Sequence, residues 1–131
     1  MTKLPTLLFL FSFAYFCYFV PAANADNSNI PPSYQAAYQT LLEHRQYFLE
    51  NRAEAVRNLN ECDSYLNEID KLMVSNISDS IRERLAAVRL DWQKAKNADQ
   101  EDLENAEDGI RRMDDGLAKL EADMKMFASL K

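Results

Sequence analysis

The sequence predicts an all-α protein: an elongated antiparallel helical hairpin or slender coiled-coil bundle of two long helices, or of three in an alternative reading. Two long stretches place apolar residues three and four positions apart, the spacing of one helix face. A short segment rich in turn-forming residues separates them at 74–79. A short connection makes two such helices antiparallel neighbours.

The first stretch runs from Tyr34 to about Val74 without glycine or proline. We expect Ser33 to cap it. A second apolar row, at Leu42, Leu49 and Val56, widens its first half and favours packing against more than one neighbour. The main row is a heptad seam sustained over more than five repeats. Its members are Tyr34, Tyr38, Leu41, Phe48, Ala55, Leu59, Cys62, Leu66, Ile69 and Met73.

The second stretch follows the turn segment. Ser80 with Glu83 has the spacing of a capping box, and Ser78 is an alternative cap. Its seam runs through Ile81, Leu85, Val88, Trp92 and Ala95, then resumes at Leu103, Ala106, Ile110, Met113, Leu117, Leu120, Met124 and Phe127. The gap before Leu103 adds four residues to the heptad, which is a stutter. Without glycine or proline there, one continuous helix is favoured. The alternative is a third helix starting near Asn97, with Asn97 and Gln100 as a cap pair.

The register of the hairpin follows from the position of the turn. If the turn centres near Asn76, Arg45 lies level with Glu107, and Arg52 lies level with Asp99 and Gln100. Both arginines stand where the seam expects an apolar residue. There they either fix register and partner choice or extend their charged ends to the surface.

The first 25 residues have the features of a secretory signal peptide. Lys3 precedes an apolar run at 4–20, and the run is followed by Ala23-Asn24-Ala25. We expect cleavage after Ala25 and export to the periplasm or the extracellular space; the alternative is an uncleaved membrane anchor. The predicted organisation is a signal peptide at 1–25, a polar linker with two prolines at 26–33 and a helical domain at 34–131.

Charge and cysteine content narrow the classes of partner. Cleavage leaves 14 bases against 21 acids, because Lys3 is removed. That balance disfavours nucleic acid and anionic membrane surfaces, and leaves the membrane as a partner only through an uncleaved signal segment. Cys62 becomes the only thiol; its seam position favours a buried hydrophobic role, with an intermolecular disulfide as the alternative.

No pattern in the sequence indicates catalysis, a metal or a cofactor. Six acids and no base lie between Asp99 and Asp108, but a calcium loop would need glycine where Glu104 stands. His44 is the only histidine, so neither a catalytic triad nor a histidine metal site is expected. The acidic stretch is either a solvated face or a docking patch for a basic surface.

Two glycines, Gly109 and Gly116, lie seven apart on one helix face. They indicate either the close approach of another helix or local flexibility. The candidate interaction residues are therefore Arg45, Arg52, Asp99, Glu101, Asp102, Glu104, Glu107, Asp108, Gly109 and Gly116.

The predicted function is protein–protein interaction rather than catalysis. We expect an exported accessory or scaffold subunit of an envelope-associated assembly, with self-association as one outcome. The alternative is a secreted inhibitor or chaperone-like protein that captures a basic client through the acidic stretch.

Overall fold

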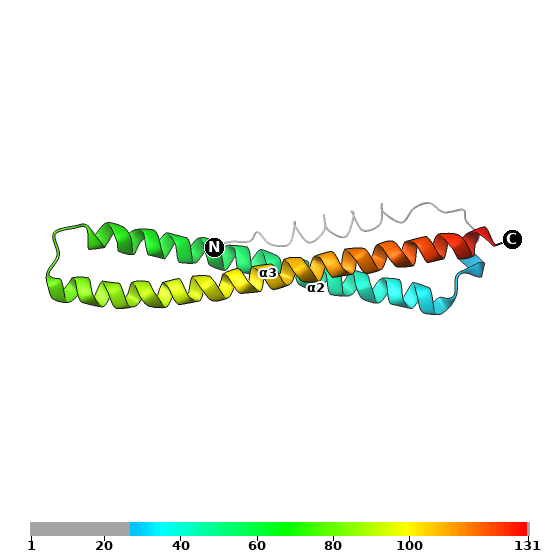
Figure 1. Cartoon of the computed structure of the whole chain (residues 1–131), viewed down its shortest axis with the longest axis horizontal. Coiled ribbons are helices and arrows are strands. Elements are labelled where there is room, and N and C mark those ends of the chain that lie inside the picture. The colour runs from blue at the N-terminus through cyan, green and yellow to red at the C-terminus, as the bar shows by residue number, and fades with distance from the viewer. Residues whose placement is uncertain (1–26, 131) are drawn as a thin grey trace, which may run out of the picture.

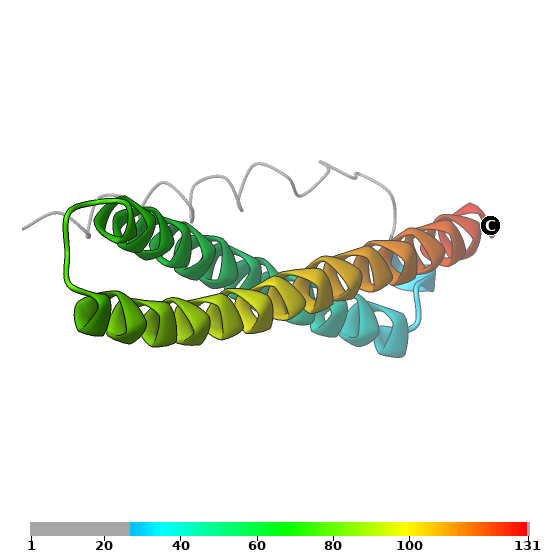
Figure 2. The same cartoon turned by 60° about the vertical axis from the view of Figure 1, so that its left-hand side comes forward.

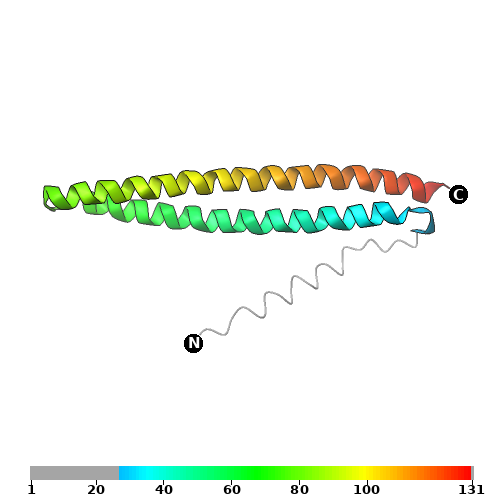
Figure 3. The ribbon, with the colours of Figure 1, turned by 90° about the horizontal axis from the view of Figure 1, so that it is seen from below.

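The computed structural model describes residues 27–130, which form a long hairpin of two helices without a strand (Figure 1). A 3-10 turn, η1 (Asn27–Asn29), precedes α2 (Pro32–Met73) and α3 (Asp79–Ser129). The two long helices cross near their middles in Figure 2 and lie side by side along their length in Figure 3. The predicted signal peptide at 1–25 lies outside the described residues.

The hairpin begins earlier than the sequence pattern indicated. Pro32 is the first residue of α2, and the preceding Pro31 offers no side-chain cap, so Ser33 is not the cap. Proline suits this place because its ring presets the helical φ angle and the missing N–H would have no partner there. Part of the expected linker is also packed: Ile30 is buried, and Asn29 Nδ2 donates a hydrogen bond of 2.8 Å to the carbonyl of Leu130.

The connection between the helices uses the second of the two expected caps. The Ser78 hydroxyl accepts a hydrogen bond from the Ile81 N–H, so Ser78, and not Ser80 with Glu83, caps α3. Across the turn, the Arg82 guanidinium donates to the carbonyl of Met73 at the end of α2. This bond satisfies one of the carbonyls that a helix end leaves without an intrahelical partner.

Three ion pairs between the helices define the register. They are Arg45–Asp114 at 2.6 Å, Asp63–Lys96 at 2.5 Å and Asp70–Arg89 at 2.7 Å. In each pair the residue numbers add up to 159, whereas the predicted register required about 152. The predicted pairing of Arg45 with Glu107 is therefore wrong, by one heptad. Figure 1 shows the cause: the connection runs on past the end of α2 before α3 begins.

The continuous α3 is confirmed, but the stutter is not. Heptad spacing continues without interruption through Leu85, Arg89, Trp92, Lys96 and Asp99, all of which are partly shielded from solvent. Charged residues thus occupy positions that face α2. Ile81 precedes Arg82 and Val88 precedes Arg89, so both lie to one side of the face that meets α2. They are 49% and 44% exposed. Counting apolar residues misplaced the seam because Arg89 and Lys96 meet acids on α2.

The two sides of the hairpin differ in chemistry. One side, which we call the ion-pair flank, carries the three ion pairs and the hydrogen bond from the Tyr38 hydroxyl to Glu121. On the other, the glycine flank, α2 side chains lie over Gly109 and Gly116. The buried apolar residues are few, and three of the seven are small: Ile30, Ala55, Cys62, Leu66, Ile69, Ala106 and Leu117. Over residues 27–130, neither helix has an apolar stretch long enough to cross a membrane.

Candidate protein-interaction surfaces

The structure does not gather the predicted interaction residues into one site. Arg45 pairs with Asp114, and Arg52 lies on the ion-pair flank beside Glu107, where both line a shallow recess with Ile110. The sequence had placed Arg52 level with Asp99. Asp99 instead faces α2 about two turns further along, next to Asn58 and Cys62.

The acidic stretch is spread around α3. Asp108 pairs with Arg111 and Arg112 on its own helix, and Gln100 donates a hydrogen bond of 3.3 Å to Glu104. Within residues 27–130, five acids of the stretch have no ion pair with a base. Asp99 is partly buried against α2, whereas the other four are exposed: Glu101, Asp102, Glu104 and Glu107. Their negative charge remains available to a partner.

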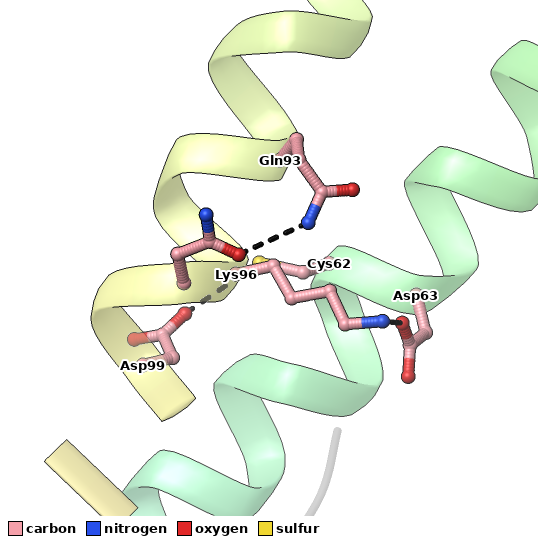
Figure 4. A network of polar contacts seen from close by, with 6 residues as sticks. Cys62, Asp63, Gln93, Lys96 and Asp99 are labelled. Carbon is pink, nitrogen blue, oxygen red and sulfur yellow. Dashed lines mark hydrogen bonds and ion pairs between the residues drawn. The ribbon is translucent and has the colours of Figure 1, made fainter. Parts of the chain in front are cut away.

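A small polar cluster lies inside the hairpin, beside the Asp63–Lys96 ion pair (Figure 4). The Cys62 thiol donates to Asp99 Oδ2 at 3.5 Å, and Asn58 Nδ2 donates to Asp99 Oδ1 at 3.4 Å. Burial raises the pKa of Cys62, and the hydrogen bond to Asp99 raises it further. The thiol is therefore kept in its less reactive protonated form, in a small core position as its seam spacing indicated.

The two glycines allow close approach within the hairpin, by side chains of α2. A Cβ atom at Gly109 would lie 2.5 Å from the Phe48 ring, and one at Gly116 would lie 3.0 Å from Leu41 Cδ1. Real Cβ atoms do not approach a ring that closely. The absence of a side chain at Gly109 is thus what admits the phenyl ring between the helices.

Exposed apolar side chains gather on the glycine flank near the connection. Tyr65 and Leu72 of α2 are 45% and 50% exposed, and their exposure matches that of Ile81 and Val88 of α3. The Tyr65 ring of α2 stacks on the Trp92 ring of α3, with ring centres 4.3 Å apart. Both helices therefore contribute side chains to this flank. Sequence reasoning missed this surface, which we call the closed-end apolar face, because it assigned Ile81 and Val88 to the seam.

A second feature of the glycine flank is a recess of about 350 Å³ near the middle of the hairpin. Phe48, Ala55 and Ala106 form its apolar part. The polar groups around them are Tyr47, Asn51, Glu54, Asn58, Asp102 and Asn105. Only Asp102 among them had been identified from the sequence.

The titratable groups whose pKa is shifted within residues 27–130 all lie in contacts between the two helices. No three His, Cys, Asp or Glu side chains of residues 27–130 converge as ligands for a metal ion. The pKa of Asp70 is lowered by the hydrogen bond that it accepts from Arg89. This pair is exposed on the ion-pair flank and joins the two helices.

Comparison with protein-family models, with curated proteins and with solved structures finds no match for this chain.

Proposed function

We propose that this protein is an exported helical protein–protein interaction module, working as an accessory or scaffold subunit of an envelope-associated assembly. Export is supported by the signal-peptide pattern at 1–25. The observation that carries the interaction role is the closed-end apolar face. Four large apolar side chains, each close to half exposed, lie along one flank of a hairpin whose own core is small.

A surface of this kind favours a helical partner. Along α3 the residues Ile81, Leu85, Val88 and Trp92 are spaced by four, three and four, the pattern by which one helix packs on another. Burial of such side chains contributes roughly 1.5–3 kcal/mol each when it is complete. A partner helix laid between Tyr65 and Val88 would add the apolar contacts that two helices alone do not supply.

Capture from the native envelope fraction tests this proposal. We expect the exported protein to retain a defined partner, and the double variant Ile81→Gln with Val88→Gln to lose it. Leu90→Gln is the matched control, because Leu90 is 55% exposed but lies on the opposite side of α3 from Val88. Equal capture by all three proteins, at unchanged helix content, would rule out the closed-end apolar face as the binding surface.

A second candidate function is the capture of a basic client through the acidic stretch, as a secreted inhibitor or chaperone-like protein. It is supported by the four exposed acids of the stretch that have no ion pair with a base within residues 27–130. Association with such a client should slow steeply as salt is raised, because charge attraction accelerates encounter. Association rates that do not change with salt would exclude this candidate.

A further inference from the structure

The recess on the glycine flank exists because two core positions are small. Ala55 and Ala106 face each other across the hairpin, and both are buried, at 3% and 2% exposure. The neighbouring Phe48 leans toward Gly109 instead of filling the space above the alanines. A hollow with an apolar floor is left between the helices.

The walls of this recess carry hydrogen-bond acceptors and no base. Glu54 and Asp102 contribute carboxylates from opposite helices, and neither has an ion pair with a base within residues 27–130. Asn51 and Asn105 contribute amide oxygens, as does Asn58, whose Nδ2 is already engaged with Asp99. No lysine, arginine or histidine lines the recess.

Aromatic side chains complete one wall. Tyr47 is 59% exposed at the rim and packs edge to face against Phe48, with ring centres 5.5 Å apart. The faces of such rings attract cations through their quadrupoles. Carboxylates, amide oxygens and aromatic rings around one hollow are the groups that bind an organic cation.

We propose that the recess binds the guanidinium group of an arginine side chain presented by a protein partner. A planar guanidinium directs five N–H donors outward and stacks on aromatic rings, so one group can meet both carboxylates and the amide oxygens. A lysine ammonium has three donors at a single point and cannot span the two helices in the same way. The inference rests on the second candidate function and names the side chain by which a basic client is held.

The charge around the recess supports this assignment. The segment of α3 from Asp99 to Asp115 carries eight acids and two bases. The recess opens within this segment, at Asp102 and Asn105. A cationic side chain is therefore drawn toward it at a distance and held by hydrogen bonds on arrival.

Nuclear magnetic resonance titration of the exported protein tests the proposal. The probe is a blocked Gly-Arg-Gly peptide, and its twin carries citrulline, which has nearly the same shape without the charge. We expect the arginine peptide to shift the side-chain amide signals of Asn51 and Asn105. It should bind about tenfold more tightly than the citrulline peptide, which lacks one charge-assisted hydrogen bond. A lysine twin should bind more weakly than the arginine peptide.

Two variants with the same change of charge locate the site. Asp102→Asn should weaken binding of the arginine peptide about tenfold. Glu107→Gln removes one negative charge from the ion-pair flank, where it lies beside Arg52, and should weaken binding less than about twofold. Equal losses of affinity in both variants would show that the arginine peptide is not bound in the recess. General attraction to the acidic segment would then explain its binding.

Other results distinguish the arginine site in the recess from the second candidate function, the capture of a basic client. Equal binding of the arginine and citrulline peptides, or no shift at Asn51 and Asn105, overturns the guanidinium site. If a basic client is nevertheless captured with salt-dependent rates, the second candidate function stands without the recess. If the arginine peptide binds as expected but no client is captured, the recess stands and that function fails.

Discussion

Gly109 and Gly116 have the same place in the heptad and different surroundings. A Cβ at Gly109 would meet three ring atoms of Phe48 at 2.5–2.6 Å, whereas one at Gly116 would meet the end of the flexible Leu41 side chain at 3.0 Å. Replacing a helical glycine by alanine gains about 1 kcal/mol from helix propensity. Crowding a packed core costs about 1–3 kcal/mol. The two effects compete differently at the two sites.

We expect Gly109→Ala to lower the free energy of unfolding by up to about 2 kcal/mol, because the Phe48 ring has to move. Gly116→Ala should leave it unchanged or raise it by up to about 1 kcal/mol, because Leu41 can rotate away. Urea unfolding followed by circular dichroism measures both. A Gly109→Ala variant more stable than the parent protein would show that the ring does not pack against this glycine.

Cys62 gives the hairpin a pH dependence in the alkaline range. Its folded-state pKa is raised by burial and by the bond to Asp99, so the folded protein holds the thiol proton more tightly than the unfolded chain does. The resulting stability is fully present below about pH 8.5, the ordinary thiol pKa, and is lost as the pH rises through the raised value. The slope of unfolding free energy against pH should therefore be negative above about pH 8.5.

Cys62→Ala is the control for this slope, because alanine cannot titrate. We expect the variant to show a flatter profile between about pH 8.5 and 9.5, whatever its absolute stability. The Tyr38 hydroxyl, whose pKa is also raised by burial and by its bond to Glu121, loses its proton only above that window. Identical slopes for the two proteins would contradict the buried, hydrogen-bonded thiol.

Polar contacts between α2 and α3 set the register of the helix pair. Arg45 and Asp114 are bonded at 2.6 Å, with side chains 36% and 49% exposed. A double-mutant cycle on Arg45→Ala and Asp114→Ala should give a coupling of about 0.2–1 kcal/mol, the range of exposed ion pairs. The same cycle with Glu107→Ala should give none. Coupling of Arg45 to Glu107 and not to Asp114 would show that the helices pair in the register one heptad away.

The sequence was sufficient to predict two long antiparallel helices, since apolar spacing repeats along both and a cluster of turn residues lies between them. It was insufficient for the register, because a heptad pattern matches itself after every seven residues. The connection also extends along the hairpin axis, which the position of Asn76 in the sequence does not reveal.

The face of α3 near the connection was misjudged for another reason. Ile81 and Val88 are apolar, and their spacing satisfied the seam, but Arg89 and Lys96 face α2 because Asp70 and Asp63 are there to receive them. A pattern within one helix cannot weigh the charges of the opposite one. The recess was missed likewise, because it depends on Ala55 and Ala106 coming together from distant parts of the chain.

The whole molecule should behave in solution as a rod. The 51 residues of α3 extend over about 75 Å at the rise of an α-helix. A rod of that length has a radius of gyration of about 22 Å, whereas a compact domain of about 105 residues would have about 13 Å. Small-angle scattering of residues 27–130 at low concentration should give the larger value. The smaller value, with helix content retained, would mean that the long hairpin folds back on itself.

The ends of the described chain lie close together, and the connection between α2 and α3 lies far from them. Asn29 is bonded to Leu130, so both ends of the described chain meet at one tip, while Val74, 87% exposed, stands at the other. Anything joined to either end is thereby held at a fixed distance from whatever the far tip contacts. Because the two helices repeat in steps of seven, removing one heptad from each would shorten the reach by about 10 Å and keep every layer matched. The hairpin has the properties of a molecular ruler, whose length is set by the number of its repeats.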